Sequence, residues 1–339
     1  MKNPAEPDPE EGPSFLPQRV HIRWRKILLR GLGAAALTAA ALGGAHRMAA
    51  KSGAAELPNV PVATAGGNQL WADVAWDDGW RVQTHVWTGH ARLLDEDNVR
   101  QAWGSRAKCA AKLAERRANG DARATRDKAV VLLHGLWRTR RAMADLGAAF
   151  DEAGYDVIDI GYPSTRRSVA EHSAQVAELL DGLVGDGVEL SFVTHSLGSL
   201  VVRDLLKREG DAWRSQHKLG RAVFIAAPSN GAALANFAKR IPGAFAIYGK
   251  PSKEIASGLA ARLAVPNIPF ATIAAGRGTE DGWNPLIPGD DDGVVGVEEA
   301  QLKGSSAHLT VEGVHTFVME DAKVIAATLS FIESGALTD

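Results

Sequence analysis

Three positions in the C-terminal half of the chain carry side chains that together could transfer an acyl group. The serine is Ser196 in "THSLG", the acids stand in "GDDDG" at 289–293, and the histidine is His315 in "VEGVHTF". A serine hydroxyl becomes a nucleophile when an imidazole takes its proton and a carboxylate fixes the orientation of that imidazole. These residue types predict covalent catalysis, provided that the fold brings the three positions together.

Ser196 stands at a predicted junction of strand and helix. The run "VELSFVT" at 188–194 predicts a buried strand, and the apolar residues after it recur at helical spacing to about residue 209. A sharp turn of this kind lifts a nucleophile above a sheet and needs small residues two positions before and after it. Gly198 meets this need and Thr194 meets it in part. The alternative is a helix N-cap, a position that serine also favours.

The sequence "LLHGLW" follows the predicted strand 129–133 and supplies the second part of such a site. In a strand-turn-helix hydrolase site, an N–H of this loop pairs with the N–H after the nucleophile to hold an oxyanion. That arrangement points to the backbone of Leu136 and Leu197, and Gly135 would keep the main chain clear of a substrate. We interpret His134 as a structural hydrogen-bonding residue and not as a base.

The acid and the base must follow the serine, each after a strand. Asp290, Asp291 and Asp292 follow the predicted strand 268–275, and His315 follows the predicted strand 307–312. His315 would take the proton of the serine and return it to the leaving group. A calcium loop or a solvated turn is the alternative for "GDDDG". His195 adjoins the serine, but neighbours on a strand point to opposite faces, so it is a poor candidate for the base.

Short apolar runs alternate with amphipathic stretches from residue 129 onward, which predicts a parallel sheet covered by helices. The predicted strands are 129–133, 155–160, 188–194, 221–227, 268–275 and 307–312. Ser168 and Glu171 form a capping-box pattern at the start of a predicted helix.

A tryptophan-rich segment precedes the alternating region. In "LWADVAWDDGWRVQTHVW" apolar and polar residues alternate on both sides of Asp78-Gly79, which predicts a β-hairpin. The tryptophans at 71, 76, 80, 87 and 103 could form a binding face, but packing on a half-buried sheet is the favoured interpretation.

Six motifs in order resemble the lipase-like α/β-hydrolases, in particular a bacterial branch of serine esterases and lipases. The resemblance covers about residues 129–333. The motifs are "HGLWRTRRAM" (134–143), "GYDVIDIGYPS" (154–164), "THSLG" (194–198), "AAPSNGA" (226–232), "DDGVVGV" (291–297) and "HTFVM" (315–319).

The resemblance implies an α/β-hydrolase fold: a mostly parallel sheet with helices on both faces, an N-terminal Trp-rich β-hairpin and a small helical cap. It selects Asp292 as the triad acid because the aspartate directly before Gly-x-Val has that role in the family. Two positions depart from the pattern, since Ser229 replaces a proline and Trp137 stands where a small residue is commoner. Trp137 therefore puts the width of the acyl pocket in question.

The connection between the predicted strands 221–227 and 268–275 would carry the cap, at about residues 229–266, and with it the choice of substrate. Phe237 and Phe245 would line an acyl-facing surface, although packing of the cap onto the body is an equal alternative. Tyr162 follows a strand at the edge where sites in open α/β sheets gather, so it would line the mouth together with Trp137.

Composition limits the partners and cofactors. The formal net charge of −2 is far from the basic balance of nucleic-acid-binding domains, so no nucleic-acid partner is expected. The single cysteine, Cys109, excludes an intramolecular disulfide and a multi-cysteine zinc site, and its helical context predicts a buried thiol. The proposed chemistry needs no metal and no organic cofactor.

The first seventy residues differ from the rest. Residues 1–26 are proline-rich, acidic and then basic, which predicts a disordered leader. Residues 27–50 are mostly alanine, glycine and leucine after that basic cluster, an order typical of a signal segment or a marginal membrane anchor. An Ala-rich surface helix is the alternative. Residues 51–69 predict a linker, and residues 70–339 predict the hydrolase domain. An anchored or exported chain would hold this domain outside the cytoplasmic membrane. Without an anchor or export signal, the protein would be cytoplasmic.

The sequence predicts a serine hydrolase that cleaves carboxylic, lipid-like esters through an acyl-enzyme at Ser196. Two alternatives stay open. The same three residues could transfer an acyl group to another acceptor or cleave a thioester, or the chain could be a catalytically silent scaffold tethered to the envelope.

Overall fold

The computed structural model describes residues 59–338. The predicted leader at 1–26, the predicted anchor or signal segment at 27–50 and the first part of the predicted linker lie outside the described residues. No helix within 59–338 has the length and hydropathy that crossing a bilayer requires.

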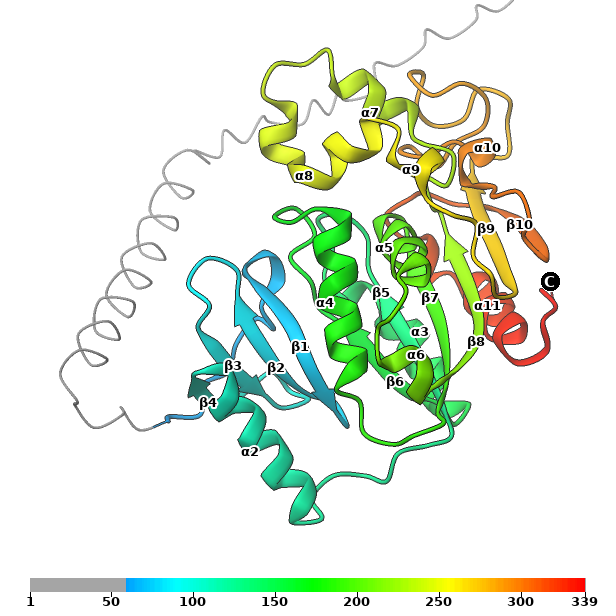
Figure 1. Cartoon of the computed structure of the whole chain (residues 1–339). Coiled ribbons are helices and arrows are strands. Elements are labelled where there is room, and N and C mark those ends of the chain that lie inside the picture. Colours follow the sequence, from blue (N-terminus) through cyan, green and yellow to red (C-terminus); the bar gives the residue numbers. More distant parts are fainter. Residues whose placement is uncertain (1–58, 339) are drawn as a thin grey trace, which may run out of the picture. The chain divides into compact units, whose positions relative to one another are not determined.

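Six parallel strands form the central sheet, in the order β10-β9-β8-β7-β5-β6 (Figure 1). The inner strands carry runs of valine, leucine, isoleucine and alanine that are apolar on both sides because helices cover both faces of the sheet, while the two edge strands alternate between more and less buried residues. Each predicted strand of the alternating region is present, with shifts of a few residues at some ends. The strands are β5 (Lys128–Leu133), β6 (Asp156–Ile160), β7 (Glu189–His195), β8 (Lys218–Ile225), β9 (Phe270–Gly276) and β10 (Ala307–Glu312).

Alternate residues of each strand face different helices. Val130 and Leu132 of β5 pack in one core with α3 (Ala144–Glu152) and α11 (Ala322–Ser334). Val131 and Leu133 pack in the opposite core with the helices α4 (Val169–Asp181), α5 (Leu197–Lys207) and α6 (Trp213–Gln216). The capping box predicted before α4 is present, with Ser168 and Glu171 each accepting from the other's backbone N–H. Short helices η2 (Arg140–Met143), α10 (Val297–Ala300) and η3 (Val318–Glu320) complete this part.

The N-terminal hairpin belongs to a second, four-stranded antiparallel sheet. The predicted turn at Asp78 and Gly79 has φ of 47° and 80°, as a tight hairpin turn requires. The sheet has the order β1-β2-β3-β4 and does not join the parallel sheet; instead β1 contacts α4. Its last two strands were not predicted from the sequence. The elements are β1 (Trp71–Asp77), β2 (Trp80–His85), β3 (Ala91–Leu94), β4 (Arg100–Gly104) and the helix α2 (Arg106–Ala118).

The helix α2 covers one face of this sheet, and Cys109 is fully buried there as a free thiol. Burial raises the pKa of this thiol to about 11. Cys109 is therefore a packing residue and a weak nucleophile.

Residues 59–69, the second part of the predicted linker, are attached to the antiparallel sheet. Ala63 forms a β-bridge with Val99, and the backbone N–H of Arg100 donates to the carbonyl of Val62. The segment ends in a short helix, η1 (Asn68–Leu70), that leads directly into β1.

The connection from β8 to β9 contains three helices, α7 (Ala233–Ala238), α8 (Ala244–Ala256) and α9 (Leu259–Arg262). Helices α7 and α8 lie beyond the carboxyl end of β8, at the top of Figure 1. This is the segment in which the sequence places the cap.

One buried arginine joins both ends of that connection to α5. The Arg203 guanidinium is 2% exposed and donates to the carbonyls of Ser229, Ala260, Leu263 and Ala264 at 2.8–3.2 Å. Burial lowers the pKa of Arg203 to about 10, so the group is still charged at neutral pH. A single cation therefore joins the segment before α7 and the segment around the end of α9 to one helix.

Arg203→Met should lower the free energy of unfolding by about 3 kcal/mol, because it leaves buried carbonyls without a donor. Arg208→Met is the matched control: Arg208 pairs with Asp211 on the partly exposed end of the same helix. The control should lose less than about 1 kcal/mol. Urea unfolding of the two variants measures this, and equal losses would contradict the assigned role of Arg203.

Candidate active site

Ser196 occupies a strained turn between β7 and α5. Its φ of 52° and ψ of −117° lie in a region that residues with a Cβ rarely adopt. The turn is held by the Ser196 N–H, which donates to the carbonyl of Ile225 at 2.9 Å, and by close packing at Gly198. A Cβ at Gly198 would lie 2.6 Å from the carbonyl oxygen of Leu133. Only glycine permits this approach of helix to strand.

The structure brings Ser196, His315 and Asp292 into one hydrogen-bonded chain. The Nε2 atom of His315 lies 3.0 Å from the Oγ atom of Ser196, and its Nδ1 atom lies 2.7 Å from Oδ2 of Asp292. With Nδ1–H donating to the carboxylate, Nε2 presents its lone pair to the serine hydroxyl. This is the arrangement in which an imidazole can accept the serine proton.

The backbone orients the Asp292 carboxylate. Its Oδ1 atom accepts from the N–H groups of Val294 and Val295 at 2.9 and 2.8 Å, which leaves Oδ2 for His315. The N–H of His315 also donates to the carbonyl of Asp292 at 2.9 Å. The carboxylate and the imidazole are therefore fixed relative to each other by main-chain bonds.

The other two acids of "GDDDG" have different partners. Asp290 accepts from the N–H groups of Arg277 and Gly278, and Asp291 accepts from those of Trp283, Asn284 and Gly293. Both carboxylates therefore shape the loop after β9. Across residues 59–338 there is no group of three or more His, Cys, Asp or Glu side chains that could hold a metal ion.

His195 supports His315 from the other side. Its Nε2 atom lies 3.0 Å from the carbonyl oxygen of His315, and the two rings are 4.8 Å apart. Burial, with the neighbouring His315 imidazole, lowers the pKa of His195 well below its ordinary value. A neutral His195 can donate this hydrogen bond without placing a second positive charge beside His315.

The loop from His134 to Arg138 passes against the serine. A Cβ at Gly135 would lie 3.1 Å from Cβ of Ser196 and 2.7 Å from Nδ1 of His195, so the main chain runs close to the nucleophile. Leu136 and Leu197, the predicted oxyanion donors, therefore belong to segments that adjoin Ser196. Trp137, directly after Leu136, has φ of +61°.

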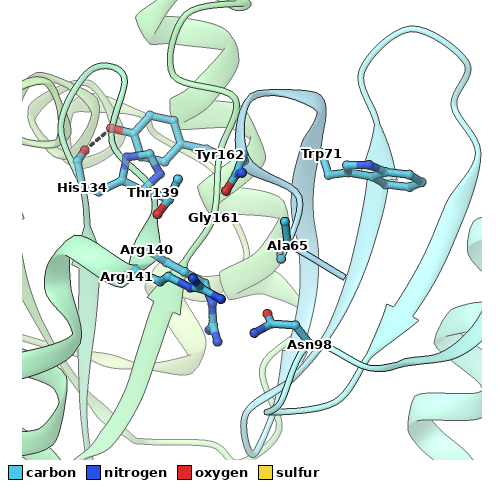
Figure 2. A pocket seen from close by; sticks show the side chains of 11 residues that line it. Ala65, Trp71, Asn98, His134, Thr139, Arg140, Arg141, Gly161 and Tyr162 are labelled. Atoms are coloured by element: carbon cyan, nitrogen blue, oxygen red, sulfur yellow. Dashed lines mark hydrogen bonds between the residues drawn. The ribbon is translucent and has the colours of Figure 1, made fainter. Parts of the chain in front are cut away.

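His134 is a structural residue of this loop. Its Nδ1 atom donates to the carbonyl of Gly135 at 2.8 Å, and its own carbonyl accepts from the hydroxyl of Tyr162 (Figure 2). The rings of Tyr162 and His134 are stacked 4.3 Å apart, and His172 contacts the edge of Tyr162. Tyr162 is 1% exposed. It therefore packs behind the loop, and these contacts do not present it to a substrate.

The other predicted lining residues are more accessible. Trp137 is 49% exposed, while Phe237 on α7 and Phe245 on α8 are half-buried. Ile247 and Tyr248 of α8 are exposed as well. Contact of these side chains with a substrate stays a prediction.

Comparisons with known proteins agree with this architecture. A family model described as a domain of unknown function, DUF7379, matches residues 93–242, which is less than half of the chain. No curated protein matches the sequence. Among solved structures, the lipase BlEst2 of Bacillus licheniformis in its propeptide form is similar with a TM-score of 0.50 and 17% identity, over 64% of this chain and 52% of that one.

Two further structures are similar at lower scores. The mature form of BlEst2 has a TM-score of 0.47 and 17% identity, over 61% of this chain and 91% of that one. The lipase of Staphylococcus hyicus has a TM-score of 0.42 and 13% identity, over 58% of this chain and 90% of that one. The chain has the α/β-hydrolase fold, with bacterial lipases and esterases among its structural neighbours.

Gly198→Ala should lower the free energy of unfolding by about 2 kcal/mol, because the added methyl meets main-chain atoms that cannot rotate away. Gly147→Ala in α3 is the control, since its Cβ would only reach ordinary contact distance from the side chains of Val157 on β6 and Leu132 on β5. The control should be neutral or gain up to about 1 kcal/mol. Chemical denaturation compares the two, and a neutral Gly198→Ala would contradict the close packing of this turn.

Acid should destabilise the fold through two buried imidazoles. Burial lowers the pKa of His134 to about 4 and that of His172 to about 3, from 6.5. Below pH 6.5 the unfolded chain binds protons that the folded chain does not, so stability is full above pH 6.5 and falls as the pH decreases toward 4. His172→Gln should make the free energy of unfolding fall less steeply across this range, by about 1 kcal/mol per pH unit. If the free energy of unfolding falls with decreasing pH equally steeply in the variant and the parent, the role of the buried His172 imidazole is contradicted.

Proposed function

We propose that the protein is a serine hydrolase that cleaves carboxylic esters, with Ser196 as nucleophile, His315 as general base and acid, and Asp292 as the acid that orients it. The observation that carries this proposal is the hydrogen-bonded chain from Asp292 through His315 to Ser196, at 2.7 and 3.0 Å. The ester-hydrolase-like fold supports the same class of chemistry.

The first half of the reaction forms an acyl-enzyme. The Oγ atom of Ser196 attacks the ester carbonyl carbon while its proton moves to Nε2 of His315. The carbonyl oxygen becomes an oxyanion, and the bond to the leaving oxygen then breaks as that oxygen receives the proton from His315. Asp292 stabilises the imidazolium that exists between these two transfers.

Water completes the second half. His315 takes a proton from water, the resulting hydroxide oxygen bonds to the acyl carbon, and Ser196 leaves with the proton returned by His315. The products are a carboxylic acid and the alcohol released earlier. The side chains of the triad therefore end in their starting protonation states.

The N–H groups of Leu136 and Leu197 would hold the oxyanion. Leu197 is the first residue of α5, where the free N–H groups and the helix dipole favour negative charge. Leu136 belongs to the loop whose main chain adjoins Ser196. Donors fixed before the reaction stabilise the developing charge without reorganising during the attack.

The exposed apolar side chains point to esters with an apolar acyl group. Trp137, Ile247, Tyr248 and Phe317 are each about half exposed or more. Trp137 adjoins Leu136 in sequence, Phe317 follows His315 by two residues, and the other two stand on α8. We assign acyl selection to Trp137 and to the β8–β9 connection, including Phe237 and Phe245.

The test is hydrolysis of p-nitrophenyl esters from short to long acyl chains. Ser196→Ala and His315→Ala should lower kcat at least about 10³-fold, and Asp292→Asn about as much, because each interrupts the proton path. Asp281→Asn is the matched control, an exposed acid of the same loop, and it should keep the parent rate.

Two outcomes would overturn the proposal: a folded parent that hydrolyses none of the esters, or a Ser196→Ala variant that keeps the parent rate. Acyl transfer by the same residues would instead show as a faster release of p-nitrophenol when an alcohol acceptor is added. Thioester cleavage would show as a higher kcat/KM for the thioester analogue than for the ester.

A further inference from the structure

The loop that carries Leu136 is held in a strained shape by side chains from outside the parallel sheet. Trp137 has φ of +61°, a conformation that costs a residue with a Cβ about 1–2 kcal/mol. Such strain persists only where the surroundings hold the backbone from several sides. The groups that hold Trp137 therefore also determine the direction of the neighbouring Leu136 N–H.

We propose that Gln69 is a positioning residue that fixes this loop in its oxyanion-binding shape. The inference rests on the proposed function, because it concerns the loop assigned to the oxyanion. Gln69 belongs to η1, the short helix before the antiparallel sheet, 65 residues or more before the loop in sequence. It touches none of the reacting atoms and acts through the main chain of the loop.

The carboxamide of Gln69 contacts the loop directly and through a serine. Its Nε2 atom donates to the carbonyl of Arg138 at 3.3 Å and to Oγ of Ser164 at 2.9 Å. The same Ser164 oxygen accepts from the N–H of Trp137 at 3.1 Å. The N–H of the strained residue and the carbonyl of the next residue, Arg138, are therefore both linked to one carboxamide, the first through Ser164 and the second directly.

Gln69 is itself fixed by the segment after β6. Its Oε1 atom accepts from the N–H and from the hydroxyl of Thr165, both at 2.9 Å. Ser164 is 0% exposed and Thr165 is 5% exposed, so the carboxamide of the partly buried Gln69 bonds to two buried residues. With its oxygen bound to Thr165, the carboxamide presents its NH₂ group to Ser164 and Arg138 in a single orientation.

A second contact ties the same segment to the antiparallel sheet. The carboxylate of Asp73 on β1 accepts from the N–H of Gly161 at 2.6 Å, and the N–H of Asp73 donates to the Gly161 carbonyl at 3.0 Å. Gly161 precedes Tyr162, whose hydroxyl donates to the carbonyl of His134 at the start of the loop. Figure 2 shows Gly161 and Tyr162 next to each other, and its dashed line marks the hydrogen bond from the Tyr162 hydroxyl to the carbonyl of His134.

These contacts give the N-terminal part a role in the reaction although it contributes no triad residue. Asp73 acts on the beginning of the loop through Tyr162, and Gln69 acts on its end through Ser164 and Arg138. Removing the Gln69 carboxamide frees the Trp137 peptide to relax toward negative φ. The Leu136 N–H would then turn away from the oxyanion while the triad stays intact.

The experiment is the kinetics of Gln69→Met on a p-nitrophenyl ester that the parent hydrolyses. We expect kcat at least 10-fold lower with KM within about 3-fold of the parent, because the oxyanion exists only after attack. A trifluoromethyl ketone, which forms a tetrahedral adduct with the serine, should bind more weakly by the factor by which kcat/KM falls. Gln101→Met is the matched control, since Gln101 lies on β4 of the antiparallel sheet that follows η1, and its carboxamide donates to Asp95 and not to the loop.

Several results would overturn the inference. They are an unchanged kcat in a folded Gln69→Met, a loss confined to KM, or equal losses in Gln101→Met. If Gln69→Met does not fold, Ser164→Ala must show the same split between kcat and KM. If the parent is active, Ser196→Ala is inactive and Gln69→Met is unaffected, then only the positioning role of Gln69 is refuted. If the parent itself is inactive, the proposed function is refuted and this inference with it.

Discussion

The hydrogen bond between Nε2 of His315 and Oγ of Ser196 joins two segments that are 119 residues apart in sequence. It can form because β7 and β10 are parallel members of one sheet, so that the turn after β7 and the loop after β10 emerge at the same edge. Each partner is fixed by main-chain contacts: Ser196 by Ile225 and the close approach of Gly198 to Leu133, and His315 by the backbone of Asp292. The helices packed on both faces of the sheet hold these contacts in register.

Two residues with positive φ adjoin the proposed oxyanion donors in sequence, since Ser196 precedes Leu197 and Trp137 follows Leu136. Ser196 and Trp137 both adopt conformations that cost free energy, and each is held by neighbours that leave no alternative. For Ser196 the constraint is steric and comes from Gly198 against the strand β5. For Trp137 it is the hydrogen bond that its N–H donates to Oγ of Ser164, which Gln69 supports in turn. The polar donors of the site are thus placed before a substrate arrives, which is the condition for electrostatic stabilisation of an oxyanion.

The inner strands of the parallel sheet were predictable because they are largely buried on both faces and therefore read as apolar runs, whereas the edge strands β6 and β10 alternate between more and less buried residues. The strands β3 and β4 were not predicted, since "ARLL" and "RQAWG" are short and show no clear alternation. The order of serine, acid and histidine indicated the triad, but only the resemblance to the lipase-like family separated Asp292 from its two neighbours.

The supporting residues were beyond the reach of the sequence. Gln69 and Ser164 interact across 95 positions, and nothing in the residues around either one indicates such a contact. Tyr162 was expected at the mouth of the site because it follows a strand, yet it is 1% exposed, stacked on His134 and in edge contact with His172, which places it in the interior. Local patterns thus locate reacting groups more readily than the groups that hold them.

Mapping the adduct of a fluorophosphonate on the folded chain tests the central claim most directly, because phosphorus bonds only to a serine that a neighbouring base has activated. The account predicts one phosphonate per chain, located by peptide mass spectrometry on Ser196, and its loss in a folded His315→Ala variant. Labelling of a different residue, or an unlabelled Ser196 in a folded chain, would contradict it.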